Sequence, residues 1–189
     1  MIYGTVPFDK KNFQRYLDKK TILLDYGCGT GVWDKKIPIK VLKIYLYDKN
    51  KFLYNVLKKK YAQNKKIFLL KKIDKIKKIK INAVIINSVF QYLHEEKVIK
   101  LIKLFYEIGI NKIFITDIPK TSRLVEIFYN IFNYNYIINI IKYLFNPSYH
   151  KIKYFNHNYS FLKNISYKNK IIKNFNNTKN RYGILLWKH

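Results

Sequence analysis

The stretch Thr21–Trp33, TILLDYGCGTGVW, decides the fold of this 189-residue chain. Its apolar run Ile22–Leu24 ends at Asp25, and glycines follow at every second position, at Gly27, Gly29 and Gly31. Glycine is needed where the backbone takes positive φ or must approach a ligand closely. A helix beginning after the last glycine would present free N–H groups to a ligand above the turn. The pattern predicts a strand–turn–helix unit that binds a nucleotide-like cofactor at the carboxyl edge of a parallel sheet.

The spacing of the glycines separates two kinds of cofactor. A dinucleotide site needs G-x-G-x-x-G, but here Gly31 comes one residue too early. The pattern Asp-x-Gly-x-Gly-x-Gly resembles instead the first motif of the class I S-adenosylmethionine-dependent methyltransferases. The resemblance implies that Asp25 and the glycines cradle the methionine part of S-adenosylmethionine. The spacing of the glycines disfavours a nicotinamide oxidoreductase. The alternative without a function is a tight strand–helix turn that binds no ligand.

Two acidic residues extend this resemblance along the chain. Val41–Tyr47 is rich in β-formers and ends at Asp48, which can accept hydrogen bonds from ribose hydroxyls. The family uses an acidic residue at the end of its second strand in this way; a turn-initiating Asp is the alternative. A third strand is expected near Lys66–Leu70, and Asp74 is the acid behind it that would reach the adenine amine. A solvated loop Asp is equally compatible with that position.

The fourth and later strands follow the same plan. Asn82–Ser88 is almost wholly apolar, as a central parallel strand should be, and runs into Val89 and a polar–aromatic–leucine stretch typical of the family. Lys112–Thr116 predicts a fifth strand ending in Asp117-Ile118-Pro119, and Arg181–Trp187 resembles the last strand, in a terminal hairpin. The cofactor-binding residues implied are Asp25, Gly27, Cys28, Gly29, Gly31, Asp48, Asp74, Ser88 and Val89.

The implied fold class is α/β: a Rossmann-like seven-stranded, mostly parallel sheet with an antiparallel last strand and helices on both faces. Helices are expected over residues 8–19, over Lys51–Gln63 and over Glu95–Ile108, the last two from their apolar spacing. The length suits a single domain, 1–189. Its one cysteine, Cys28, excludes a disulfide framework and a zinc cluster, so no metal is expected. The start lacks the pattern of a signal peptide, and the expected compartment is the cytoplasm.

The net charge of +27 raises the question of a nucleic-acid partner. Lysine accounts for 35 residues and arginine for only 3, although arginine is preferred for bidentate phosphate and base contacts. Lys, Ile, Asn, Tyr and Phe, all encoded by A+T-rich codons, make up 116 of the 189 residues. Genome composition can therefore supply the charge, and the sequence favours no specific nucleic acid as partner.

The segment Arg123–Phe145 is long and mostly apolar, but Glu126, Lys142 and four asparagines argue against a membrane span. It lies in a 120–158 segment expected to be a helical insertion. Three roles stay open for it: a lid over the acceptor pocket, peripheral membrane contact through its aromatic residues, and ordinary burial.

The resemblance implies methyl transfer to a small-molecule acceptor, such as a sugar or a lipid-linked intermediate. Ser88-Val89-Phe90-Gln91 stands where enzymes that methylate the amino groups of nucleic-acid bases often have an Asn-Pro-Pro-Tyr-like motif. An RNA or protein methyltransferase and a non-catalytic cofactor-binding subunit stay open as alternatives. A hydroxyl acceptor would need a base, and the candidates are Tyr92, His94, Asp117 and His150.

Overall fold

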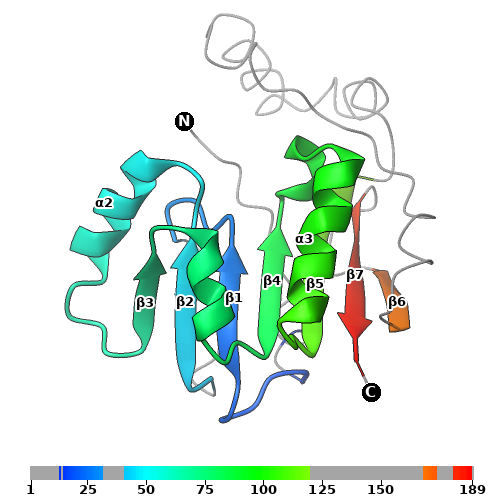
Figure 1. Cartoon of the computed structure of the whole chain (residues 1–189), viewed down its shortest axis with the longest axis horizontal. Coiled ribbons are helices and arrows are strands. Elements are labelled where there is room, and N and C mark those ends of the chain that lie inside the picture. The colour runs from blue at the N-terminus through cyan, green and yellow to red at the C-terminus, as the bar shows by residue number, and fades with distance from the viewer. Residues whose placement is uncertain (1–12, 14, 32–40, 120–167, 174–180, 189) are drawn as a thin grey trace, which may run out of the picture.

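The described strands of the protein form one twisted sheet. The computed structural model describes residues 13, 15–31, 41–119, 168–173 and 181–188. Their strands form a seven-stranded sheet in the order β3-β2-β1-β4-β5-β7-β6 (Figure 1). The strands are β1 (Ile22–Tyr26), β2 (Lys43–Tyr47), β3 (Ile67–Leu70), β4 (Ala83–Asn87), β5 (Lys112–Pro119), β6 (Lys168–Lys173) and β7 (Arg181–Trp187).

The first five strands are mutually parallel, and β7 runs antiparallel to both of its neighbours, β5 and β6. This confirms the mostly parallel sheet with an antiparallel last strand, and the pairing of β6 with β7 confirms the terminal hairpin. The order reverses direction at β1, whose neighbours are β2 and β4. In open α/β sheets such a switch point is where ligands bind, at the carboxyl ends of the strands.

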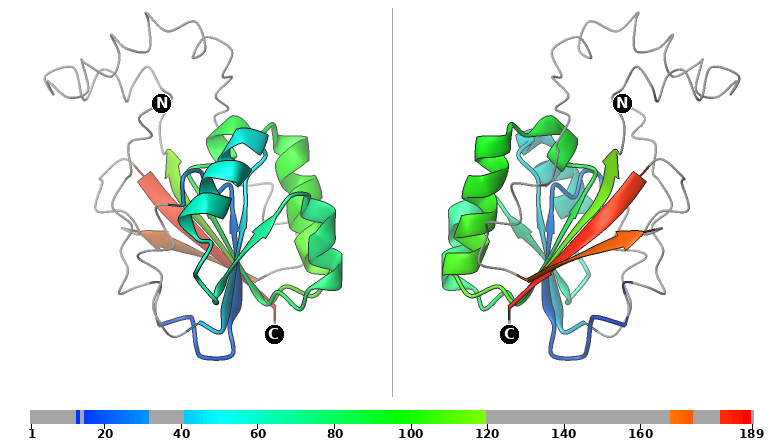
Figure 2. Two further views of the ribbon diagram at one scale, coloured as in Figure 1. Left: turned by 90° about the vertical axis from the view of Figure 1, so that its left-hand side faces the viewer. Right: turned by 90° about the vertical axis from the view of Figure 1, so that its right-hand side faces the viewer.

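Helical elements cover both faces of the sheet. They are α2 (Lys51–Lys60), α3 (Glu95–Glu107) and the short 3₁₀ helices η1 (Ile73–Lys78) and η2 (Phe90–Tyr92). One core cluster joins α3 and η1 to the sheet through Ile102, Phe105 and Ile76; the opposite cluster contains Leu57 of α2 and Phe13. Figure 2 shows α3 standing against one face of the sheet when the sheet is viewed along its edge. The central strand β4 is buried at every position, as its apolar sequence requires.

The helix expected over residues 8–19 is wrong at its carboxyl end. Phe13 is helical, but residues 15–16 and 19–20 form turns, and residues 17–18 have no regular structure. The Asp18 carboxylate accepts hydrogen bonds from the Lys20 N–H and the Thr21 hydroxyl. These local bonds lower the pKa of Asp18, the Thr21 hydroxyl contributing most, and they compete with helix continuation. The Phe13 ring packs edge-on against Phe114, at 4.6 Å between centroids, so this segment covers the face of β5.

The expected 120–158 insertion and the segment Arg123–Phe145 lie outside the described residues. Among the helices that are described, none is sufficiently long and apolar to cross a membrane.

Candidate functional site

The glycine turn leaves β1 at the carboxyl edge and is fastened to β2. The N–H groups of Gly27 and Cys28 both donate to the Tyr47 carbonyl, at 2.7 and 3.1 Å. The Gly29 N–H donates to Oδ2 of Asp48 at 2.9 Å, and Oδ1 of Asp48 accepts from the Asn50 N–H at 2.8 Å. The structure therefore brings together the turn and the acidic residue that the sequence placed on neighbouring strands.

The three glycines of the turn all have positive φ, between 56° and 77°, but their surroundings differ. A Cβ on Gly27 would lie 2.4 Å from Cγ2 of Val89, and a Cβ on Gly31 would lie 2.8 Å from Cδ2 of Leu57. Among the described residues, a Cβ on Gly29 would meet no atom within 4 Å. Gly27 and Gly31 are thus required by packing within the protein, whereas the space above Gly29 is open to a ligand.

Asp25 and Cys28, two of the predicted cofactor-binding residues, are both buried. Asp25 is 1% exposed at the end of β1, and Cys28 is 3% exposed within the turn itself. The Cys28 sulfur contacts the Gly29 carbonyl at 3.9 Å. The Cys28 side chain belongs to the core cluster that also contains Phe13 and Leu57.

Two tyrosines, Tyr26 and Tyr47, pair beside the predicted cofactor site. The rings of Tyr26 and Tyr47 lie 5.3 Å apart. Burial raises the pKa of Tyr26 to about 12, with the neighbouring Tyr47 and Asp48 adding to it. Burial also raises the pKa of Tyr47, followed by the charges of Asp48 and Asp74. Asp74 is exposed in the first turn of η1, and its role toward the cofactor stays a prediction.

On the other side of the switch point, Ser88 and Asp117 meet. Ser88 follows β4, Asp117 lies near the end of β5, and the Ser88 hydroxyl donates to Oδ2 of Asp117. Among described non-glycine residues these two alone have positive φ, 56° and 61°. The β5–β7 register shifts between Ile115 and Ile118, so a bulge turns Asp117 out of the regular pleat. Positive φ is costly for such residues and persists only where the surroundings impose it.

A buried polar network holds this pair. The Thr116 hydroxyl donates to Oδ1 of Asn87 at 2.7 Å, and Nδ2 of Asn87 donates to the Ser88 hydroxyl at 3.2 Å. Nε2 of Gln91 donates to the Ser88 carbonyl at 3.4 Å. Asp117 is 3% exposed and Thr116 is 2% exposed. Sequence reasoning missed Asn87, Gln91 and Thr116. Asn87 and Thr116 each follow an apolar run, which is a signal in the sequence, whereas Gln91 lies in η2 and carries no such signal.

The remaining candidate residues of the site have fewer contacts with the glycine turn and with the Ser88–Asp117 pair. Val89 packs against Gly27 and so joins the two sides of the edge. Tyr92 is half-buried in η2 and donates its backbone N–H to the Val89 carbonyl. His94 is exposed at the start of α3, with no capping hydrogen bond from its side chain. His150 lies outside the described residues. Within those residues, no group of three or more potential ligands could hold a metal ion.

Solved structures of other proteins share the fold of this chain. A putative type 11 methyltransferase from Sulfolobus solfataricus is 18% identical, with a TM-score of 0.58 over 94% of this chain and 88% of that chain. Magnesium protoporphyrin IX methyltransferase from Synechocystis PCC 6803, solved with bound SAH, is 14% identical, with a TM-score of 0.58 over 94% and 80%. An rRNA methylase from Streptococcus thermophilus is 10% identical, with a TM-score of 0.56 over 95% and 93%. This chain has the fold of the S-adenosylmethionine-dependent methyltransferases. No protein-family model matches it, and no curated protein matches it either.

Proposed function

We propose that the chain is an S-adenosylmethionine-dependent methyltransferase. The observation that carries the proposal is the open space above Gly29, bounded by a carboxylate that the turn itself holds in place. The fold and the glycine spacing both support this cofactor over a dinucleotide.

The residues of the turn fit the cofactor. A carboxylate has about four acceptor positions, and Asp48 uses one on each oxygen for the protein backbone. The positions left over suit the two hydroxyls of a ribose. Asp74 and Tyr47 would bound the adenine, while Asp25, Cys28 and the glycines would line the methionine end. The fixed orientation of Asp48 means that little is lost in ordering it on binding.

The Ser88–Asp117 pair is the proposed site for the methyl acceptor. When bound, S-adenosylmethionine supplies an electrophilic methyl group. The protein must place a nucleophile in line with that methyl group, which is chiefly a matter of positioning. Val89 ties Ser88 to the glycine turn, and the buried network fixes Asp117 behind it. Asp117 is suited to accept a hydrogen bond, or a proton, from a hydroxyl acceptor.

For the acceptor itself, the proposal is a small molecule, supported by Ser88-Val89-Phe90-Gln91 in place of the motif used for base amino groups. Ser88 then has two roles, beside the cofactor and against the acceptor. RNA is a second candidate, favoured by one specific observation, the concentration of lysines at the β3 end of the sheet. The cytoplasm stays the proposed compartment.

The test compares two glycine substitutions. Gly29→Ala places a methyl group in the proposed cofactor space. Gly109→Ala is the matched control, because Gly109 has φ +79° and follows α3 at the opposite edge, and a Cβ there would meet no atom of the described part of the chain within 4 Å. Both variants carry a similar backbone cost, roughly 1–2 kcal/mol. Calorimetry should show S-adenosylmethionine binding by the wild type and by Gly109→Ala, and at least about a tenfold loss in Gly29→Ala. Equal affinity in all three proteins, or binding of NADH alone, would overturn the proposal.

A further inference from the structure

The charge of the described chain is concentrated in one part of the fold. Residues 49–80 contain 13 lysines and one acidic residue, Asp74, and every one of these lysines is exposed. Residues 81–119 contain 4 lysines and 4 acidic residues and are formally neutral. A uniform compositional bias would load both stretches with lysine. The contrast shows that position in the fold, as well as composition, decides where the lysines lie.

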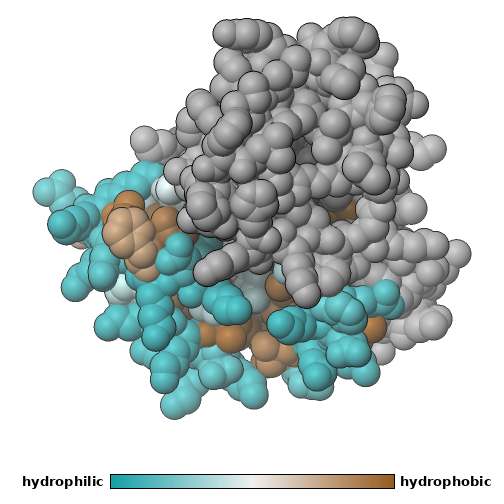
Figure 3. All heavy atoms as spheres, turned by 90° about the horizontal axis from the view of Figure 1, so that it is seen from above, coloured by the Kyte–Doolittle hydropathy of each residue, from teal (hydrophilic) through white to brown (hydrophobic). Residues whose placement is uncertain are grey.

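The lysine-rich stretch forms one end of the sheet. It comprises α2, the edge strand β3 and η1, and we call this region the basic edge (Figure 1). Viewed from above the carboxyl edge, hydrophilic residues dominate the described surface on this side (Figure 3). Lysines on an edge strand can also guard it against pairing with another chain. None of the thirteen lies within β3, however, so guarding the strand does not account for them.

Aromatic side chains lie among these lysines. Phe52, on α2, is 70% exposed, and Phe68, on β3, is 38% exposed. The Phe68 ring stacks on Tyr45 at 5.3 Å, with Nζ of Lys43 5.5 Å from its centroid. Nζ of Lys71 lies 5.3 Å from the Tyr54 ring. Exposed aromatic rings interleaved with cations suit a single-stranded nucleic acid, whose bases stack on the rings while its phosphates meet the cations.

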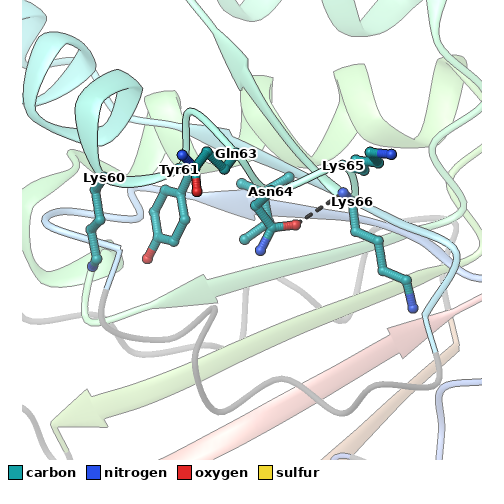
Figure 4. A pocket seen from close by; sticks show the side chains of 7 residues that line it. Lys60, Tyr61, Gln63, Asn64, Lys65 and Lys66 are labelled. Atoms are coloured by element: carbon teal, nitrogen blue, oxygen red, sulfur yellow. Dashed lines mark hydrogen bonds between the residues drawn. The ribbon is translucent and has the colours of Figure 1, made fainter.

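The basic edge is also hollowed. A concavity of about 660 Å³ lies between the end of α2 and the start of β3, lined by Lys60, Tyr61, Gln63, Asn64, Lys65, Lys66 and Ile67. Figure 4 shows the side chains of Lys60, Tyr61 and Lys66 extending to the same side. Nζ of Lys60 donates to the carbonyls of Thr30 and Gly31, at 2.6 and 3.0 Å, and so is held in position. A hollow that combines cations, amides and a ring fits a nucleotide better than the flat surface of an anionic bilayer.

We propose that the basic edge binds single-stranded RNA through its phosphate backbone, without sequence preference. The lysines supply the electrostatic attraction, and the exposed rings supply stacking. The lysine ammonium is a point charge and lacks the planar, bidentate geometry of the arginine guanidinium. Lysine therefore suits contacts to the phosphate backbone more than recognition of particular bases. RNA binding by this surface is proposed separately from methyl transfer, although Lys60 and Tyr61, which line the concavity, also donate hydrogen bonds to the Gly31 carbonyl at the end of the glycine turn.

The test measures RNA binding by two triple variants that lose the same charge. One is Lys58→Gln, Lys59→Gln and Lys65→Gln, in the basic edge. The other is Lys97→Gln, Lys100→Gln and Lys103→Gln, on α3, where all three lysines are exposed. The probe is a fluorescein-labelled single-stranded RNA of mixed sequence, titrated at several salt concentrations. The basic-edge variant should bind at least about tenfold more weakly and show a salt slope smaller by about 2 to 3. The α3 variant should stay within about twofold of the wild type.

Three results would overturn this proposal: no binding by the wild type, an equal loss in both variants, or tighter binding to phosphatidylserine vesicles than to RNA. Calorimetry with S-adenosylmethionine on the same proteins separates the two proposals. RNA binding without cofactor binding would overturn the proposed methyltransferase function and support RNA binding by the basic edge. Cofactor binding without RNA binding would support the proposed function and overturn RNA binding by the basic edge.

Discussion

Two parts of the same sheet edge contain residues with positive φ, but they use different residue types at those positions. At the glycine turn, positive φ is taken by glycines, and Gly29 leaves open space above the chain. At the ends of β4 and β5, positive φ is taken by Ser88 and Asp117, whose side chains bond to each other. Glycine suits a surface where a ligand must approach the backbone. A strained residue with a side chain indicates that the side chain itself is needed there.

The largest expected effect separates the two carboxylates. Asp48→Asn removes charge-assisted hydrogen bonds from the ribose side, worth about 1.5–3 kcal/mol. Affinity for S-adenosylmethionine should fall roughly tenfold to a hundredfold, as calorimetry can measure. Asp117→Asn, on the acceptor side, should leave that affinity within about twofold. If both substitutions weaken the cofactor alike, the two parts of the edge form one site and the division proposed here is wrong.

The next effect concerns the tyrosines beside Asp48. Tyr26 has a pKa raised from 10.0 to about 12 in the folded protein. A raised folded-state pKa gives stability that is present below pH 10 and lost as the pH rises through about 12. Two units correspond to at most about 2–3 kcal/mol. Denaturant unfolding across this alkaline range should show a shallower decline for Tyr26→Phe than for the wild type. Parallel pH profiles would mean that Tyr26 ionises freely in the folded state.

The smallest effect tests the strain at Ser88. Ser88→Ala removes the hydrogen bond to Asp117 but keeps a side chain at φ 56°. Ser88→Gly removes the same bond and relieves the backbone. The glycine variant should therefore be the more stable of the two, by about 1 kcal/mol, in denaturant unfolding. The opposite order would show that the positive φ at Ser88 costs nothing.

The sequence predicted the sheet well because each parallel strand contains a short apolar run and is followed by a polar or glycine residue. It also paired Asp48 with the glycine turn, since neighbouring strands end at the same edge. The 3₁₀ helix η1 was not foreseen. Its lysine-rich sequence reads as a solvated loop, yet Ile73, Ile76 and Ile79 recur at every third residue, and Ile76 is fully buried. That spacing matches the 3.0-residue turn of a 3₁₀ helix.

The Ser88–Asp117 contact could not be read from the sequence. The two residues are 29 positions apart and meet only because β4 pairs with β5. Nothing in a serine or an aspartate marks positive φ, whereas the glycines of the turn do mark it. The basic edge could not be predicted for a related reason. Its lysines are close in sequence, but the contrast with the neutral residues 81–119 has a meaning only when the structure shows that the two stretches occupy separate parts of the fold.

The position of β7 has a consequence for the order of folding. β5 has paired with β4 on one side, but its other side is covered by β7, which begins 62 residues after Pro119. At about 5–20 residues per second of synthesis, that edge waits roughly 3–12 s for its partner. Ile113, Phe114 and Ile115 make the waiting edge apolar, and an open apolar edge invites pairing with another chain. The nascent protein is therefore most exposed to aggregation after its candidate ligand site has formed and before its sheet is complete.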